Sequence, residues 1–457
     1  MSAGSNEIST VMRTVSAHVA ATLQTEIPRD VAAKGKHHLL DTLAAMISGS
    51  RLRPGEMATA YAREQGGTPE ACVIGSDIIT SAVNAALANG MLAHADETDD
   101  SHEPSFSHPG CAVVPAALAM AERHGRSGAD LLRAVVLGYD IGARFTLALD
   151  PRDFYARGFS SHAFAGLFGA SAAAFALAGL DADAVRQGFS FTAQQASGLA
   201  TWVRDEEHVE KAFDFAGMPA RNAVASATMM TAGFTGVADV FSGDRNVFAT
   251  FAPASDIAVM SRELGRNYEI MRANIKKWSV GSPIQAALDA IEHLMAQEDL
   301  TAGQVETILV RLPDSEAHIV DGRAMPDVNL QHLVAVLLVR GGLDFKSAHD
   351  YALMEDASVR AMRERIRLVA DAELGAAVPR RQAVVEVATR DGRRLRRRTH
   401  AVRGTADNPM DTTEIEAKAF DLAKDVFDEQ KAHAFVERIG EIETVADVRE
   451  LRPLLQP

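Results

Sequence analysis

The densest group of side chains that can do chemistry lies between residues 94 and 110, in HADETDDSHEPSFSHPG. Like charges at this density repel one another unless protons or cations separate them, so a purely structural role is unfavourable. Two kinds of site suit these residue types: a metal site, because His and Asp bind zinc or manganese, and an acid/base site. The spacing matches no common zinc signature, and the sequence leaves both open. The candidate groups are His94, His102, His108, Asp96, Glu97, Asp99 and Asp100.

Two further segments carry isolated groups that could hold an anion. His162, in GFSSHAFAG, precedes a run of small residues that predicts a helix, and the first-turn amides of a helix favour anions. Lys211 and Arg221 flank Gly217 at the start of a long apolar helix, where cations suit paired contacts with carboxylates. In isolation, such a histidine is more often a hydrogen-bonded core or cap residue, and such cations more often lie on the surface.

Weaker signals lie later in the chain. Lys276 and Lys277 are close to a predicted domain junction, and junctions often form clefts. His332 begins a helix that looks buried, in DVNLQHLVAVLLVRGG. Either signal alone would not identify a site.

The composition limits the classes of function. A net charge of −15 makes binding of nucleic acid through the overall field unfavourable, so an anionic substrate needs a local cluster of cations. The two cysteines are too few for a usual iron–sulfur cluster and give no disulfide framework, which fits a cytoplasmic protein. The N-terminus lacks the pattern of a signal peptide. Residues 163–180 carry no charge, but they are mostly Ala, Gly and Ser, which predicts a buried helix rather than a membrane span.

Helical periodicity positions these groups in the first part of the chain. Apolar residues recur at helical spacing from Ile8 to Leu23, and a second helix begins at Pro28 and ends at Gly49. Thr80 and Ser81 can cap a helix that runs to about His94, and Ser127 can cap another. Helical patterns continue to about residue 240, with no convincing strand.

The pattern changes after about residue 270. Residues 305–312 form a β-branched run, and residues 383–390 and 393–402 flank Asp391-Gly392, a strong hairpin signal. Two helical patterns lie near residues 330–340 and 346–370. The arginines of the hairpin have no neighbouring aromatics for base stacking, which favours a solvated strand face.

From about Thr412 the sequence is helical again. The fold class expected is mainly α: a large all-helical domain with an inserted smaller α+β domain. The predicted boundaries are 1–270 for the first part of the helical domain, 271–405 for the insertion and 406–457 for helices that return to the first domain.

Read in order, these segments resemble the MmgE/PrpD family of 2-methylcitrate dehydratases and cis-aconitate decarboxylases. The resemblance covers nearly the whole chain and includes the segment 94–110, GYDIGARF, KAFDFAGMPARNAV, IKKWSVGSPIQAALDA and GTADNPMDTTEIEAKAF. It implies a helical domain with an α+β lid, a homodimer with its site between the domains, and no organic cofactor and generally no metal. It also implies dehydration, decarboxylation or epimerisation of small di- and tricarboxylates.

The resemblance also suggests roles for individual residues. The family's leading aspartate corresponds to Glu97, unless Asp96 takes its part, and the family threonine corresponds to Ser101. Lys276 matches the lysine at the start of the lid, whereas Gly281, followed by Ser282, stands where members often have His or Cys. The catalytic residues expected are His108, His162, Lys211, Glu97 and Asp99. The substrate-binding residues expected are Ser101, Lys276, Arg221, His332 and Ser282.

The function expected is a cofactor-independent lyase that removes a proton beside a carboxylate, with 2-methylcitrate dehydratase-like hydration chemistry first. Decarboxylation or epimerisation is the alternative within the family. A metal-dependent hydrolase built on His94, His102, His108 and Asp99 is a second alternative. A non-catalytic carboxylate-binding protein is a third. The partners expected are a small anionic polycarboxylate and a second copy of the chain, without nucleic acid or membrane.

Overall fold

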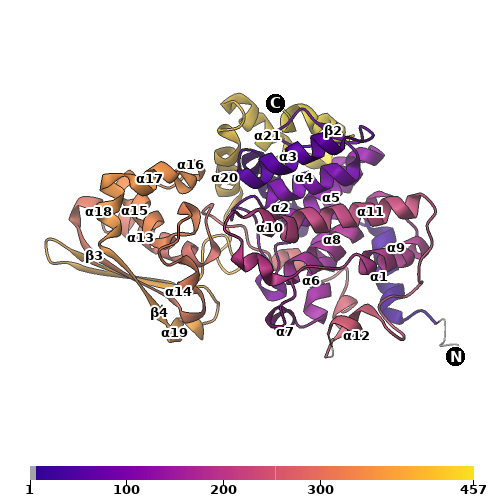
Figure 1. The fold of residues 1–457 in the computed structure, drawn as a ribbon, viewed down its shortest axis with the longest axis horizontal. Helices are drawn as coiled ribbons and strands as arrows, with labels where there is room; N and C mark the ends of the chain where they lie inside the picture. The colour runs from indigo at the N-terminus through magenta and orange to yellow at the C-terminus, as the bar shows by residue number, and fades with distance from the viewer. Residues whose placement is uncertain (1–6, 253) are drawn as a thin grey trace. The chain divides into compact units, whose positions relative to one another are not determined.

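The computed structural model describes residues 7–252 and 254–457 (Figure 1). Residues 1–6, on which the expectation about a signal peptide partly depends, lie outside the described residues. The chain is mainly helical, as predicted, and it divides into two compact units. The first unit is Met1–Ala273 with Glu416–Pro457, and the second is Asn274–Ile415.

The first unit is built from helices that pack against one another. The central ones are α2, α4, α5, α6, α8 and α11, and α20 begins just before the boundary of the unit. The helices are α1 Thr10–Ala21, α2 Arg29–Gly49, α3 Arg53–Gln65, α4 Ala82–Ala93, α5 Gly110–His124, α6 Gly128–Ala148, α7 Pro151–Ala156, α8 Ser161–Leu177, α9 Ala182–Gln194, α10 Val209–Ala212, α11 Met218–Thr231, α12 Val247–Phe251, α20 Thr412–Lys424, α21 Glu429–Gly440 and α22 Arg452–Leu455.

Local sequence signals set the ends of several helices. Ser81 and Ser127 accept hydrogen bonds from backbone amides of the first turns of α4 and α6, as the sequence predicts for N-caps. Pro28 stands at the N-cap of α2, and Gly49 is its last residue. These helices therefore begin and end where their capping residues require.

Helix α8 contains most of the uncharged segment 163–180. It is buried, and it packs against α6 through glycines at close approach: a Cβ on Gly142 would lie 2.4 Å from the carbonyl oxygen of Ala165. The prediction of a buried helix is thus confirmed. Among the described residues, no helix combines the length and apolar character needed to cross a bilayer.

Three features of the first unit differ from the prediction. A two-stranded ribbon, β1 Ala71–Cys72 with β2 Ile79–Thr80, interrupts the helices, so this unit is not all-helical. Such two-residue strands are too short to show alternation. Helix α3 was not predicted; its buried residues are Pro54, Gly55, Ala58 and Ala62. The helical run also ends at Thr231 rather than near residue 240.

The second unit contains a four-stranded sheet in the order β4-β3-β5-β6. The hairpin of β5 and β6 turns at Asp391-Gly392, where Gly392 has a φ of 90°, and its prediction is confirmed. The strands are β3 Val305–Pro313, β4 Ile366–Asp371, β5 Ala383–Thr389 and β6 Arg394–Thr399. The helices are α13 Gln285–Gln297, α14 Asp314–Val320, α15 Leu330–Arg340, α16 Phe345–His349, α17 Tyr351–Glu355, α18 Ala357–Arg363 and α19 Ala372–Gly375.

The predicted helical pattern at 346–370 is wrong in its last part. Three short helices occupy residues 345–363, because Asp350 and Asp356 cap new first turns, and residues 366–371 form β4. Strand β4 pairs in parallel with β3, from Ile308 opposite Ile366 onward. Tertiary pairing overrides the helical spacing in this short segment.

Two of the arginines of β6 lie beside acidic side chains. Arg396 lies 3.4 Å from Glu386 on the adjacent strand, and Arg398 lies 3.5 Å from Glu373. Arg394, Arg396 and Arg397 are exposed. This arrangement agrees with the predicted solvated strand face.

Candidate active site

The loop between α4 and α5 carries the acidic and histidine cluster, and a buried network holds it in place. The carboxylate of Asp100 accepts hydrogen bonds from His38 Nδ1 at 2.6 Å, from the Tyr139 hydroxyl at 2.5 Å and from the Gly110 amide at 3.1 Å. Burial alone would raise the pKa of Asp100, but the bonds from His38 and Tyr139 lower it overall. Asp100 is therefore an ionised anchor for the loop.

A second anchor comes from the C-terminal segment of the chain. Lys418, in α20, donates hydrogen bonds to Asp41 in α2 at 2.6 Å and to the carbonyl oxygen of Thr98 at 3.0 Å. Burial raises the pKa of Asp41 to about 6, although Lys418 opposes that shift. The loop is thus held by the hydrogen bonds to Asp100 and by the bond from Lys418 to the carbonyl oxygen of Thr98.

Asp99 points to the other side of the loop and contacts two imidazoles. Its carboxylate lies 2.9 Å from His94 Nδ1 and 3.2 Å from His108 Nδ1. Asp99 and His94 are fully buried, whereas His108 keeps a small exposed area. A carboxylate in this position fixes the ring orientation, favours protonated Nδ1 and stabilises an imidazolium. The second ring nitrogen of His108, Nε2, is then the one suited to proton transfer.

Phe215 brings three imidazoles together. His162 stacks on its ring with centroids 3.8 Å apart, and His94 stacks on it at 4.5 Å. The His108 ring lies 5.2 Å from His162 and 5.3 Å from His94. Two of the predicted catalytic histidines, His108 and His162, are therefore neighbours, although 54 residues separate them in the sequence.

Lys211 supplies the positive charge of this cluster. Its ammonium group forms an ion pair with Glu97, and both side chains are mostly buried. The ammonium also lies 5.3 Å from the ring centroid of Phe215 and 5.5 Å from that of Trp202. Glu97, rather than Asp96, pairs with the predicted lysine, because Asp96 accepts hydrogen bonds from the amide and hydroxyl of Thr98.

Besides Phe215, two further members of the cluster were not among the predicted site residues. His208 is buried, with its ring centroid 5.1 Å from that of His94, and has a positive φ of 60°, a strained conformation for a residue with a side chain. Trp202 lies edge-on to Phe215 at 4.6 Å. The position of His208, three residues before Lys211, is a signal in the sequence that could have identified it. Nothing in the sequence marks Trp202.

Burial determines the charge states of two of these imidazoles. The pKa of His162 is well below its usual value because of burial, and the neighbouring His108, His94 and Lys211 lower it further. The pKa of His208 is lowered in the same way, by burial and then by Lys211 and His94. At neutral pH both rings are therefore uncharged, and an uncharged imidazole can accept a proton.

A buried carboxyl group lies beside the cluster. Asp214 accepts a short hydrogen bond from the hydroxyl of Ser160, the residue that caps α8 just before His162. Burial raises the pKa of Asp214 to about 7, although the bond from Ser160 opposes the shift. This group, which sequence reasoning missed, changes charge near neutral pH.

The remaining predicted residues lie apart from these contacts or in the second unit. Ser101 is buried in the loop, and Arg221 contacts Phe213 and Asn222 instead of the imidazoles. Lys276 and His332 are buried within the second unit, and Ser282 is half-buried there. The structure thus gathers all five predicted catalytic residues, and it leaves the predicted substrate-binding residues untested.

The donor set is a poor fit for a metal ion. Ligand atoms of His94, Asp99 and Cys111 lie within 4.8 Å of one another. The Cys111 thiol, however, donates to the carbonyl oxygens of His108 at 3.1 Å and Phe215 at 3.7 Å, so the thiolate needed for binding would face two oxygens. His102, part of the predicted hydrolase set, contacts Ser105 and Glu269 instead.

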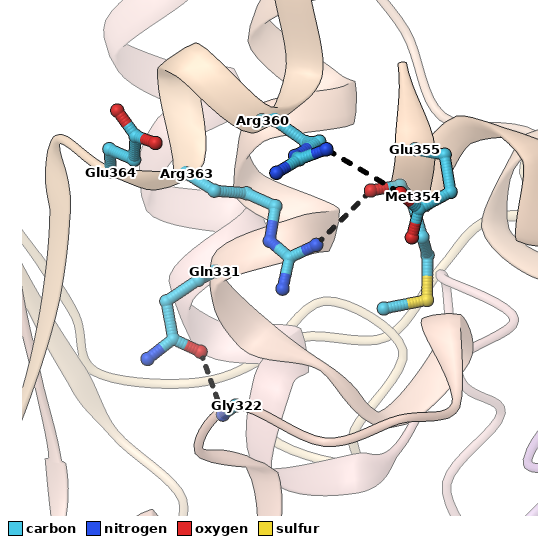
Figure 2. Close-up of a pocket in the computed structure, with 7 residues that line it drawn as sticks. All are labelled: Gly322, Gln331, Met354, Glu355, Arg360, Arg363 and Glu364. Carbon is cyan, nitrogen blue, oxygen red and sulfur yellow. Dashed lines mark hydrogen bonds and ion pairs between the residues drawn. The ribbon is translucent and has the colours of Figure 1, made fainter. Parts of the chain in front are cut away.

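A pocket of about 470 Å³ lies in the second unit (Figure 2). Arg360 and Arg363 enter it from α18, but Glu355 and Glu364 balance their charges, so it offers no net attraction to a polycarboxylate. None of the predicted site residues lines it. The lining residues are Gly322, Gln331, Met354, Glu355, Arg360, Arg363 and Glu364.

Comparison with known proteins gives consistent matches along the chain. The profile of the MmgE/PrpD N-terminal domain matches residues 13–260, and that of the MmgE/PrpD C-terminal domain matches residues 278–442. The cis-aconitate decarboxylase-like protein oryM of Aspergillus oryzae is 26% identical over 94% of both chains. A cis-aconitate decarboxylase of Aspergillus terreus is 27% identical over 61% of this chain and 59% of its own. Another from that species is 32% identical over 40% of this chain and 38% of its own.

Proposed function

Because the chain belongs to the MmgE/PrpD family, we propose that it is a lyase that acts beside a carboxylate of a small di- or tricarboxylic acid without a cofactor. One observation carries the proposal: a buried carboxylate, Asp99, contacts the imidazole of His108, which lies next to His162. The Lys211 ammonium lies 5.3 Å from the ring of Phe215, on which His162 stacks. This combination suits proton transfer next to negative charge.

Lys211 has the electrostatic task in this proposal. Removing a proton or CO₂ beside a carboxylate leaves an electron pair on carbon, and a nearby ammonium stabilises that charge. A fixed donor aimed at developing charge contributes about 10²–10³ in rate. Glu97 holds the ammonium in position before substrate binds.

Loss of CO₂ and loss of water need different proton transfers. When an unsaturated tricarboxylate loses CO₂, the electron pair of the broken C–C bond forms a new double bond, the old one shifts, and a carbon beside a remaining carboxylate takes up one proton. An acid is needed, and His108, with Asp99 behind it, is suited to donate that proton.

Loss of water instead removes a proton from carbon and delivers one to the leaving hydroxyl. His162, uncharged at neutral pH, would be the base, and His108 the acid. We place decarboxylation of a cis-aconitate-like acid first, because two of the relatives above are named cis-aconitate decarboxylase and the third is named a cis-aconitate decarboxylase-like protein. Dehydration of a 2-methylcitrate-like acid, expected first from the sequence, is the alternative, and epimerisation uses the same groups.

The experiment is incubation with a panel of acids in D₂O, followed by NMR. The panel contains cis-aconitate, 2-methylcitrate, citrate and smaller dicarboxylates. Decarboxylation predicts CO₂ release and one deuterium beside a remaining carboxylate, whereas dehydration predicts an unsaturated product that keeps every carboxylate. The variant His108→Ala should lose at least about a hundredfold in turnover.

Two outcomes would contradict the proposal. Binding of panel members without product or deuterium exchange would favour a non-catalytic carboxylate-binding protein. A stoichiometric metal whose removal abolishes activity would favour the hydrolase built on His94 and Asp99.

Several finer expectations accompany this proposal. We expect Lys276, Ser282 and His332, with Ser101 and Arg221, to bind the remaining carboxylates of the substrate. We also expect a homodimer, which light scattering would measure. A cytoplasmic location is expected because both cysteines, Cys72 and Cys111, are free thiols.

A further inference from the structure

A π-helical turn at Phe213–Gly217 lies between the helices that carry the three imidazoles. It packs against α4, which ends at His94, against α5, which His108 precedes, and against α8, which has His162 in its first turn. The approach to α4 is close, because a Cβ on Gly90 would lie 2.8 Å from the carbonyl oxygen of Ala216. Single π-turns inside helices are frequent at functional sites.

Two consecutive side chains of this turn, those of Asp214 and Phe215, reach the cluster. Phe215 is stacked on both His162 and His94 with ring planes within 15° of parallel. One face of a phenyl ring has room for one ring at such distances, so the two imidazoles lie on opposite faces. Asp214 is bonded to Ser160, which caps the helix that begins with His162. His162 is therefore held through its ring and through its backbone by one turn.

Little else fixes the His162 ring. Its buried Nδ1 has no hydrogen-bond partner among the described residues, so packing sets the orientation of the ring. The His108 ring is tilted against it at 5.2 Å and Trp202 touches it edge-on at 5.6 Å, whereas Phe215 covers it at 3.8 Å. Replacing Phe215 by an aliphatic side chain would leave the ring free to rotate and would admit water beside it.

We propose that Phe215 is a positioning residue, placed by the π-turn, that holds His162 against His108 in the orientation needed for proton transfer. The part of this inference that concerns rate rests on the proposed function. The part that concerns the orientation of the His162 ring does not depend on the proposed function, because the titration of the ring can be measured without substrate.

The test compares Phe215→Leu with Phe145→Leu. Phe145 is a matched control, since it is fully buried in α6 and stacks on Phe168 at 3.5 Å, in contacts separate from the imidazoles. Each variant is measured for its melting temperature, for kcat and KM, and for the titration of histidine side chains by NMR with labelled imidazoles. The variant His162→Gln assigns the His162 signal.

We expect both variants to lose similar thermal stability. Only Phe215→Leu should lower kcat, by at least about tenfold with KM nearly unchanged, because misorientation acts on the chemical step. Only in Phe215→Leu should His162 titrate at a higher pH than in the wild type, because water reaches the ring. The conservative variant Phe215→Tyr keeps the ring and should restore the wild-type titration.

Unchanged His162 titration in Phe215→Leu would overturn the inference, and so would equal loss of kcat in both leucine variants. If Phe215→Leu does not fold, Phe215→Met, which fills a similar volume, is measured in its place with the same criteria. If no panel acid is turned over, the rate part falls with the proposed function. The titration then decides the positioning role alone.

Discussion

Asp99→Asn tests the arrangement at the centre of the proposed site. In the wild type the carboxylate contacts Nδ1 of His94 at 2.9 Å and Nδ1 of His108 at 3.2 Å. An amide of the same shape is uncharged, and one of its two terminal groups is an NH₂ donor. Nδ1 of His108 lies 3.2 Å from both oxygens of Asp99, so in the variant it would face that NH₂ group on one side. The NH₂ group favours a His108 ring that carries its proton on Nε2, which is the wrong tautomer for the proposed transfer.

The size of the effect follows from these contacts. A hydrogen bond to a charged group contributes about 1.5–3 kcal/mol, and losing one corresponds to about 10–150-fold in rate. A wrong tautomer in a comparable Asp–His arrangement costs about 10⁴-fold in kcat. We therefore expect kcat of Asp99→Asn to fall by about 10²–10⁴-fold. KM should change by less than about threefold, because Asp99 is fully buried behind the imidazoles.

The assay is steady-state kinetics on the acid identified by the D₂O panel, with Asp140→Asn as control. Asp140 is also a buried carboxylate of the first unit, but it pairs with Arg144 at 3.0 Å and takes no part in the imidazole cluster. The control should lose stability and keep kcat. A folded Asp99→Asn protein with kcat within about fivefold of the wild type would refute the assigned role of Asp99.

Three further predictions follow from the same geometry. Lys211→Ala should lower kcat/KM at least about a hundredfold, whereas wild-type kinetics would remove its electrostatic role. Because the pKa of Asp214 is raised to about 7, its contribution to stability is present below about pH 4 and is lost as pH rises through 7. In Asp214→Asn the melting temperature should therefore fall less between pH 5 and pH 8 than in the wild type. Scanning fluorimetry can check this. Lys276→Ala and His332→Ala should each raise KM at least about threefold, and unchanged KM values in the folded variants would show that neither binds substrate.

The sequence alone indicated the elements with strong local signals. Serine caps, the proline and glycine at the ends of α2, and the Asp391-Gly392 hairpin each depend on conformations that a few neighbouring residues impose. For segments whose structure depends on distant partners, the prediction from the sequence was wrong or missing. Strand β4 exists because β3 pairs with it.

The sequence also showed that residues 94–110 hold a reactive cluster, because so many charges there need compensation. It did not show which carboxylate has which role. Asp99 and Asp100 are adjacent in the chain, yet Asp100 bonds to His38, 62 residues away, and Asp99 faces the imidazoles. In an irregular loop the direction of each side chain is set by the partners that the fold supplies, so only the tertiary structure could separate the anchor from the catalytic group.

The same reason explains why Phe215 was missed. A phenylalanine within KAFDFAG has the appearance of an ordinary core residue, and nothing local marks the π-turn that carries it. Its neighbours, His94 and His162, come from two other helices, and stacking distances of 4.5 Å and 3.8 Å exist only once those helices have packed. The sequence determined which groups could move a proton, and helix packing decided which of them meet.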